Sequence, residues 1–205
     1  MGACRSSLIA PLATLLFAAM ALLPGERAEA VVAKPVLSVS IGLGGESLKG
    51  EGLSEKTNCA AGNQLGLSAG GLLELSNTRP HVFETQLTLG ILWGSGGDGN
   101  KSTVDFTRVP LELMSYYRNA DLHFRVGYGA SYQFANRLSG QGPDAGVSTT
   151  FDNALGYVLA AESISEGGFG WGFRYTNIHY HSQRTGQSYL GEAYILSFQL
   201  AFSGN

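Results

Sequence analysis

Residues 122–134 read LHFRVGYGASYQF, and apolar side chains alternate there with polar or small ones. Successive side chains of a β-strand point to opposite faces, so this stretch predicts a strand with one apolar face. The other face carries Arg125, Ser131, Gln133 and several glycines. Alternation over about ten residues is typical of a strand that crosses a membrane as part of a β-barrel.

Seven further stretches alternate in the same way. We expect eight strands, near 36–44, 64–76, 81–93, 104–118, 121–135, 153–165, 168–181 and 192–202. Tight turns at 77–80, 119–120 and 166–167 alternate with longer loops at 45–63, 94–103, 136–152 and 182–191, which are rich in Gly, Ser, Asn and Asp. Short turns on one side and long loops on the other are typical of outer-membrane barrels. The fold class predicted is all-β, an eight-stranded antiparallel up-and-down transmembrane β-barrel.

The first thirty residues have the three parts of a secretory signal peptide. Arg5 supplies a positive charge, Leu8 to Leu23 form an apolar run, and Ala28-Glu29-Ala30 offers small residues for cleavage. The apolar run is shorter than the roughly 20 residues that a spanning helix needs. We therefore expect a signal peptide over 1–30 and an outer-membrane barrel domain over 31–205.

Net charge and cysteine content exclude further classes of function. The net charge is −3, and the leader holds two arginines and two glutamates, so cleavage leaves this balance unchanged. Such a chain is not expected to bind nucleic acid. After cleavage Cys59 is the one remaining cysteine, and we expect a solvent-exposed loop residue without a role rather than a reactive thiol.

Alternation alone does not say which face of a barrel is apolar. A lipocalin-like soluble barrel would turn the apolar face inward, around a ligand cavity. The polar face here is rich in glycine and small residues, which suits a narrow interior, and aromatic residues gather toward the strand ends, as they do at membrane interfaces. Both features favour an apolar outer surface.

Charged residues on the polar face balance one another. Four glutamates and four arginines share it, and unpaired charges inside a narrow lumen would be costly, so we expect an ion-pair network. These structural lumen charges are Glu74, Glu84, Arg108, Glu112, Arg118, Arg125, Glu162 and Arg174.

At this point the chain resembles the small eight-stranded outer-membrane β-barrel proteins of Gram-negative bacteria, of the OmpA, OmpX and OmpW types. The resemblance rests on the strand and turn rhythm, on the segments 108–113 and 124–129, and on the closing stretch 194–202, which ends in Phe202. In such families the barrel-assembly machinery reads a final aromatic residue, which here is followed by Ser203-Gly204-Asn205. Members include structural proteins, adhesins, channels and lipid-modifying enzymes.

The segment 174–182 loosely resembles the lipid A deacylases of the PagL type, in which a His-x-Ser pair precedes a glutamate on the last strand. Ester hydrolysis of this kind needs a serine that a histidine activates and an acid orients. The corresponding candidates are His179, Ser182 and Glu192, although His181 occupies the expected serine position.

The sequence therefore predicts a non-enzymatic outer-membrane protein with a structural or surface-interaction role, a plugged lumen and four exposed loops. Expected partners are outer-membrane lipid and lipopolysaccharide, the barrel-assembly machinery, and an unidentified extracellular ligand of the loops; no cofactor or metal is expected. A deacylase-like hydrolase is the first alternative. A small-solute channel is the second, since charged rings can select ions.

Overall fold

The computed structural model describes residues 32–48, 59–78, 80–97, 103–141 and 148–202. The predicted signal peptide, 1–30, lies outside these residues. Eight long strands dominate: β1 (Val32–Leu43), β4 (Gln64–Thr78), β5 (His81–Gly97), β6 (Thr103–Asn119), β7 (Phe124–Gln141), β9 (Ala154–Ile164), β10 (Phe169–His181) and β12 (Ala193–Ala201). Four short strands join them: β2 (Ser47–Leu48), β3 (Cys59–Ala60), β8 (Ser148–Thr150) and β11 (Ser188–Leu190).

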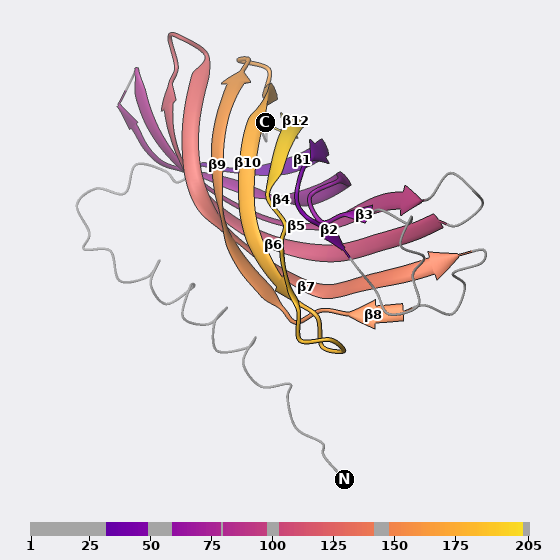
Figure 1. Cartoon of the computed structure of the whole chain (residues 1–205). Coiled ribbons are helices and arrows are strands. Elements are labelled where there is room, and N and C mark those ends of the chain that lie inside the picture. Colours follow the sequence, from indigo (N-terminus) through magenta and orange to yellow (C-terminus); the bar gives the residue numbers. More distant parts are fainter. Residues whose placement is uncertain (1–31, 49–58, 79, 98–102, 142–147, 203–205) are drawn as a thin grey trace, which may run out of the picture. The chain divides into compact units, whose positions relative to one another are not determined.

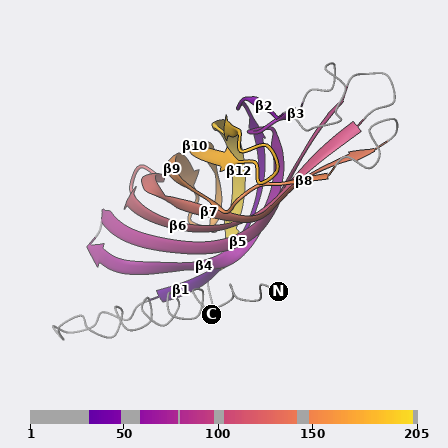
Figure 2. The same cartoon turned by 60° about the horizontal axis from the view of Figure 1, so that its bottom comes forward.

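The eight long strands close into a ring (Figure 1). Each pairs antiparallel with the next in chain order, and β12 pairs back with β1 from Val36↔Ala201 to Leu43↔Tyr194. Figure 2 shows β4 to β7 as successive curved strands of this ring. The prediction of eight antiparallel strands in an all-β fold is confirmed. No described segment forms a helix long and apolar enough to cross a membrane.

The ring has two ends, which we name by their connections. At the turn end, short links join β4 to β5, β6 to β7 and β9 to β10; at the loop end lie the other four connections. Several strands run further toward the loop end than their sequence predicts. β5, β6 and β7 have 17, 17 and 18 residues, and β7 reaches Gln141 through residues expected in a loop.

A bulge explains how β7 continues. Ala135 has a φ of +54°, and the β6–β7 register shifts opposite it, between Thr107 and Val109. A bulge adds one residue to one strand and so changes which face the following side chains occupy. Asn136 and Leu138 consequently become buried beyond Ala135. The extra residue interrupts the alternation, which is why the sequence pattern stops at 135.

The two faces of the ring differ in chemistry. Inward side chains are buried and include many polar groups, among them Arg125, Gln133 and Glu162. Outward side chains are large, apolar and exposed on all eight long strands, a surface that we call the apolar belt. It includes Leu37, Leu67, Leu89, Leu113, Val126, Leu159, Phe173 and Phe198. The large exposed apolar residues thus face outward, whereas the buried polar residues face the interior, or lumen.

Candidate functional site

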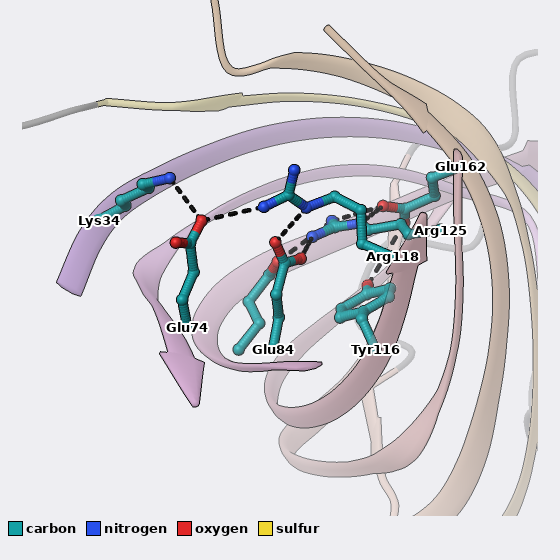
Figure 3. A network of polar contacts seen from close by, with 8 residues as sticks. Lys34, Glu74, Glu84, Tyr116, Arg118, Arg125 and Glu162 are labelled. Carbon is teal, nitrogen blue, oxygen red and sulfur yellow. Dashed lines mark hydrogen bonds and ion pairs between the residues drawn. The ribbon is translucent and has the colours of Figure 1, made fainter. Parts of the chain in front are cut away.

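Six charged side chains of alternating sign form a chain across the lumen near the turn end (Figure 3). They come from six different strands, in the order Lys34, Glu74, Arg118, Glu84, Arg125 and Glu162. Successive N···O distances are 2.6, 3.1, 2.6, 3.1 and 2.5 Å. Because every carboxylate contacts at least one cation, the chain compensates charges that would be costly to bury alone.

Arg125 lies at the most buried point of this chain. Its side chain has 0% exposure, and its guanidinium donates to Glu84 Oε2, Gln86 Oε1 and Glu162 Oε2. The Arg125 Cζ lies 3.8 Å from the centroid of the Tyr116 ring, a cation–π contact. Gly127 lies directly across from Tyr116 in the β6–β7 pairing, and a Cβ at Gly127 would clash with that ring. The glycine therefore makes room for the aromatic partner of Arg125.

The remaining predicted lumen charges lie elsewhere in the ring. Arg174 donates to Glu112 Oε2 at 2.5 Å and forms a separate pair. Arg108 is fully buried but donates to backbone carbonyls of Ala61 (2.6 Å) and Asn63 (3.1 Å) instead of a carboxylate. The structure places all eight predicted residues on the inner face, and the ion pairs within the described part of the chain include seven of them.

Three contributors to the network were not among the predicted charges. Lys34 lies two residues before the predicted start of the first strand, although it shares the inward parity of Val36. Tyr116 and Gln86 are neutral and gave no charge signal, yet Tyr116 Oη donates to Glu162 at 3.4 Å. Continuing the alternation two residues beyond the predicted strand end, toward the turn end, would have predicted Lys34 as an inward-facing charge.

A polar cavity of about 730 Å³ opens beside the network at the turn end. Lys34, Glu74, Arg118 and His123 are among its lining residues. Its charged groups already contact one another, so the arrangement suits a structural role better than proton transfer or nucleophilic attack. Among the described residues no group of three or more His, Cys, Asp or Glu is arranged to hold a metal ion.

The loop end of the lumen has a different character, because apolar side chains pack there. This loop-end cluster consists of Leu48, Cys59, Ala61, Val104, Phe106, Leu138, Phe151, Ala154, Ile178, Tyr180 and Tyr189. Cys59 is 1% exposed, so the expectation of a solvent-exposed cysteine is wrong. The reason is that the β2–β3 hairpin packs against β5 and β6 and carries Cys59 into the cluster. Burial raises the pKa of the Cys59 thiol from 9.0 to about 11.

The candidate hydrolase residues His179, Ser182 and Glu192 do not form a catalytic arrangement. His179 is exposed on the outer face, whereas Ser182 is 2% exposed and its Oγ accepts a hydrogen bond from the Thr185 backbone N–H. Glu192 Oε2 instead accepts from Tyr175 Oη. Ser182 directly follows the last residue of β10 and bridges Phe151, so its buried side chain continues the inward positions of the strand, opposite to His179.

A histidine and a serine do meet elsewhere at the loop end. His181 Nδ1 and Ser188 Oγ share a hydrogen bond of 2.7 Å between β10 and β11. Both side chains are exposed on a hairpin. Nucleophilic catalysis also needs an oriented base and donors for the developing oxyanion. The hydrogen bond by itself is an ordinary cross-strand contact.

Comparison with known proteins yields structural similarity but no sequence match. No family model matches the sequence, and no curated protein matches it. Among solved structures, the chain is similar to the Yersinia pestis outer membrane protein Ail, whose backbone structure was determined in a phospholipid bilayer nanodisc. The two chains are 11% identical, the match covers 83% of this chain and 99% of the Ail chain, and the TM-score is 0.36.

Proposed function

We propose that this chain is an integral β-barrel protein of a Gram-negative outer membrane, with a structural or surface-interaction role and no enzymatic activity. The apolar belt carries this proposal. Leu37, Leu89 and Phe173 are 51%, 52% and 64% exposed, and the belt runs over all eight long strands. Monomeric soluble proteins rarely expose continuous apolar patches above a few hundred Å². Lipid acyl chains would cover this surface, at a gain of about 25 cal/mol per Å² of apolar area removed from water.

The direction of insertion follows from the connections and the leader. A signal peptide over 1–30 would export the chain, and the barrel-assembly machinery would read the final strand. Short turns of outer-membrane barrels face the periplasm, so we assign the turn end to that side and the loop end to the cell surface. The outward loops would then meet lipopolysaccharide and an extracellular ligand.

Packing in the lumen favours a plugged barrel over a small-solute channel. The ion-pair chain occupies the turn end, and the loop-end cluster occupies the opposite end. Eight-stranded barrels have interiors that side chains just fill. We therefore propose that ion pairs and aromatic packing hold the ring in shape, and that the loop surface carries the biological interaction.

Electrophoresis of the membrane fraction, with and without boiling, tests the proposal together with refolding of the full chain. A membrane barrel should migrate differently before and after heating, and should refold in detergent micelles but aggregate in plain buffer. A urea-treated sample provides the unfolded control. A chain that stays folded and monomeric in buffer without detergent contradicts the proposal, because its belt would then tolerate water.

A further inference from the structure

Three tyrosines and one carboxylate form a compact group on the outer face, near the loop ends of β9, β10 and β12. We call this group the outer tyrosine patch: Tyr157, Tyr175 and Tyr194, with Asn177 and Glu192. Tyr175 lies directly across from Tyr194 in the β10–β12 pairing. The ring centroids of Tyr157 and Tyr175 are 6.0 Å apart, and those of Tyr175 and Tyr194 are 5.3 Å apart.

Hydrogen bonds hold the polar members of the patch against the rings. Tyr175 Oη donates to Glu192 Oε2 at 3.2 Å, and Asn177 Nδ2 donates to Tyr175 Oη at 3.2 Å. The flanking rings of Tyr157 and Tyr194 are 49% and 67% exposed. A ligand at the outer surface would thus meet two accessible aromatic rings beside an oriented carboxylate.

Glu192 differs from the carboxylates of the lumen in its partners. Glu74, Glu84, Glu112 and Glu162 each contact a lysine or an arginine, whereas no ion pair within the described part of the chain includes Glu192. Its partner there is the neutral hydroxyl of Tyr175. A half-buried carboxylate next to aromatic rings attracts a cation, because the face of each ring is also negative.

We propose that the outer tyrosine patch binds the primary ammonium group of a membrane-lipid headgroup. A primary ammonium donates hydrogen bonds, which the Glu192 carboxylate and the Asn177 carbonyl oxygen accept, while the tyrosine rings contribute cation–π contact. An anionic headgroup that lacks an ammonium group would be repelled by Glu192. The inference rests on the proposed membrane location of the barrel.

The position of the patch identifies a lipid as the carrier of the ammonium. The next outward-facing residues on the same strands, toward the turn end, are Leu159, Phe173 and Leu196. They belong to the apolar surface of the ring. A ligand bound at the patch would therefore place any attached acyl chains on the belt. A soluble amine would gain only the contacts to its charge.

Native mass spectrometry of the full chain in detergent tests this site, with phosphatidylethanolamine and phosphatidylglycerol of identical acyl chains as probes. We expect retention of phosphatidylethanolamine to exceed that of phosphatidylglycerol by about fivefold. Glu192→Gln should abolish the preference, and Tyr194→Leu should reduce it. Glu166→Gln is the matched control, because this carboxylate lies in a turn-end connection and is 93% exposed. The heat-dependent mobility shift verifies that each variant is folded.

Several outcomes overturn the inference. Equal retention of the two lipids, or an unchanged preference in both Glu192→Gln and Tyr194→Leu, removes the ammonium site. If free ethanolamine displaces bound phosphatidylethanolamine as well as the same concentration of phosphatidylethanolamine does, the assignment of the ligand to a lipid is wrong. Either result leaves the proposed membrane barrel intact as long as the chain folds only in detergent. A chain that folds in plain buffer defeats both proposals.

Discussion

Arg125 shows how a single side chain can organise the interior of a narrow ring. It reaches Glu84 on β5 and Glu162 on β9 and stacks on Tyr116 of β6. A planar guanidinium suits this position, because its five N–H donors lie in a fixed plane and can satisfy several acceptors at once. Removing one partner from a buried ion pair costs more than the pair contributes, since the other charge remains buried.

Arg125→Met is therefore expected to lower the free energy of unfolding by about 3–5 kcal/mol, because it leaves Glu84 and Glu162 with less compensation. Urea unfolding in detergent, followed by the fluorescence of Trp93 and Trp171, measures the loss. Lys34→Met is the control, with an expected loss of about 1 kcal/mol or less, since Lys34 is partly exposed and Glu74 keeps Arg118. Equal losses in the two variants would contradict a central role for Arg125.

The β2–β3 hairpin shows what a very short element needs in order to be ordered. Strands of two residues are not stable by themselves, and this hairpin depends on contacts with the ring. Arg108 donates to the carbonyls of Ala61 and Asn63, which follow β3, while Leu48 and Cys59 enter the loop-end cluster. The hairpin is therefore expected to stay ordered only while the long strands keep Arg108 and the loop-end cluster in place.

Alkylation of Cys59 reports on the docking of this hairpin. In a Cys4→Ser background, iodoacetamide at pH 8.5 should modify the folded chain at least about tenfold more slowly than the urea-unfolded chain, because the buried thiol has a raised pKa and little access. Leu48→Asp should accelerate the reaction by undocking the hairpin, whereas Leu122→Asp, at an exposed position near the turn end, should not. Equal rates in folded and unfolded chains would show that the hairpin is not docked.

The same thiol gives a pH dependence with a defined sign. The folded state holds the proton of Cys59 more tightly, with a pKa of about 11 against 9.0 without burial. Its contribution to stability is complete below pH 9 and is lost as the pH rises toward 11. Cys59→Ser should therefore flatten the decline in unfolding free energy over this interval. An unchanged decline would assign it to other groups.

At the scale of the whole molecule, the ring is arranged in the opposite sense to a soluble protein. Its charged side chains cluster inside and its large aliphatic side chains face outward. The proposed membrane location accounts for this arrangement, because it requires surroundings that are apolar at the belt and polar at both ends. A bilayer provides those surroundings, and the even number of strands brings both ends of the ring sequence to the turn end.

Leu89→Lys tests the belt directly. Leu89 lies in the middle of β5 and is 52% exposed, so a lysine there would meet hydrocarbon. In phospholipid vesicles we expect a loss of about 2–4 kcal/mol in unfolding free energy, against about 0–1 kcal/mol for Leu122→Lys near the turn end. Urea titrations of the two variants provide the measurement. A neutral effect of Leu89→Lys would place this surface in water.

Strand positions and the identity of each face were predictable from local sequence. The direction of a side chain depends only on its parity within a strand, so the stretch 122–134 already separates Arg125 from Tyr128. The same parity places all eight predicted charges on the inner face. It also separates Ser182 from His179, which counts against the predicted hydrolase site.

Other features were decided by the tertiary structure alone. The pairing of Arg125 with Glu84 joins residues 41 positions apart, and Arg108 turns to backbone carbonyls because the β2–β3 hairpin lies within its reach. The burial of Cys59 and the extension of β7 past Ala135 likewise depend on neighbours distant in sequence. Alternation is a property of one strand, whereas ion pairs, docking and burial depend on which strands close the ring and in which register.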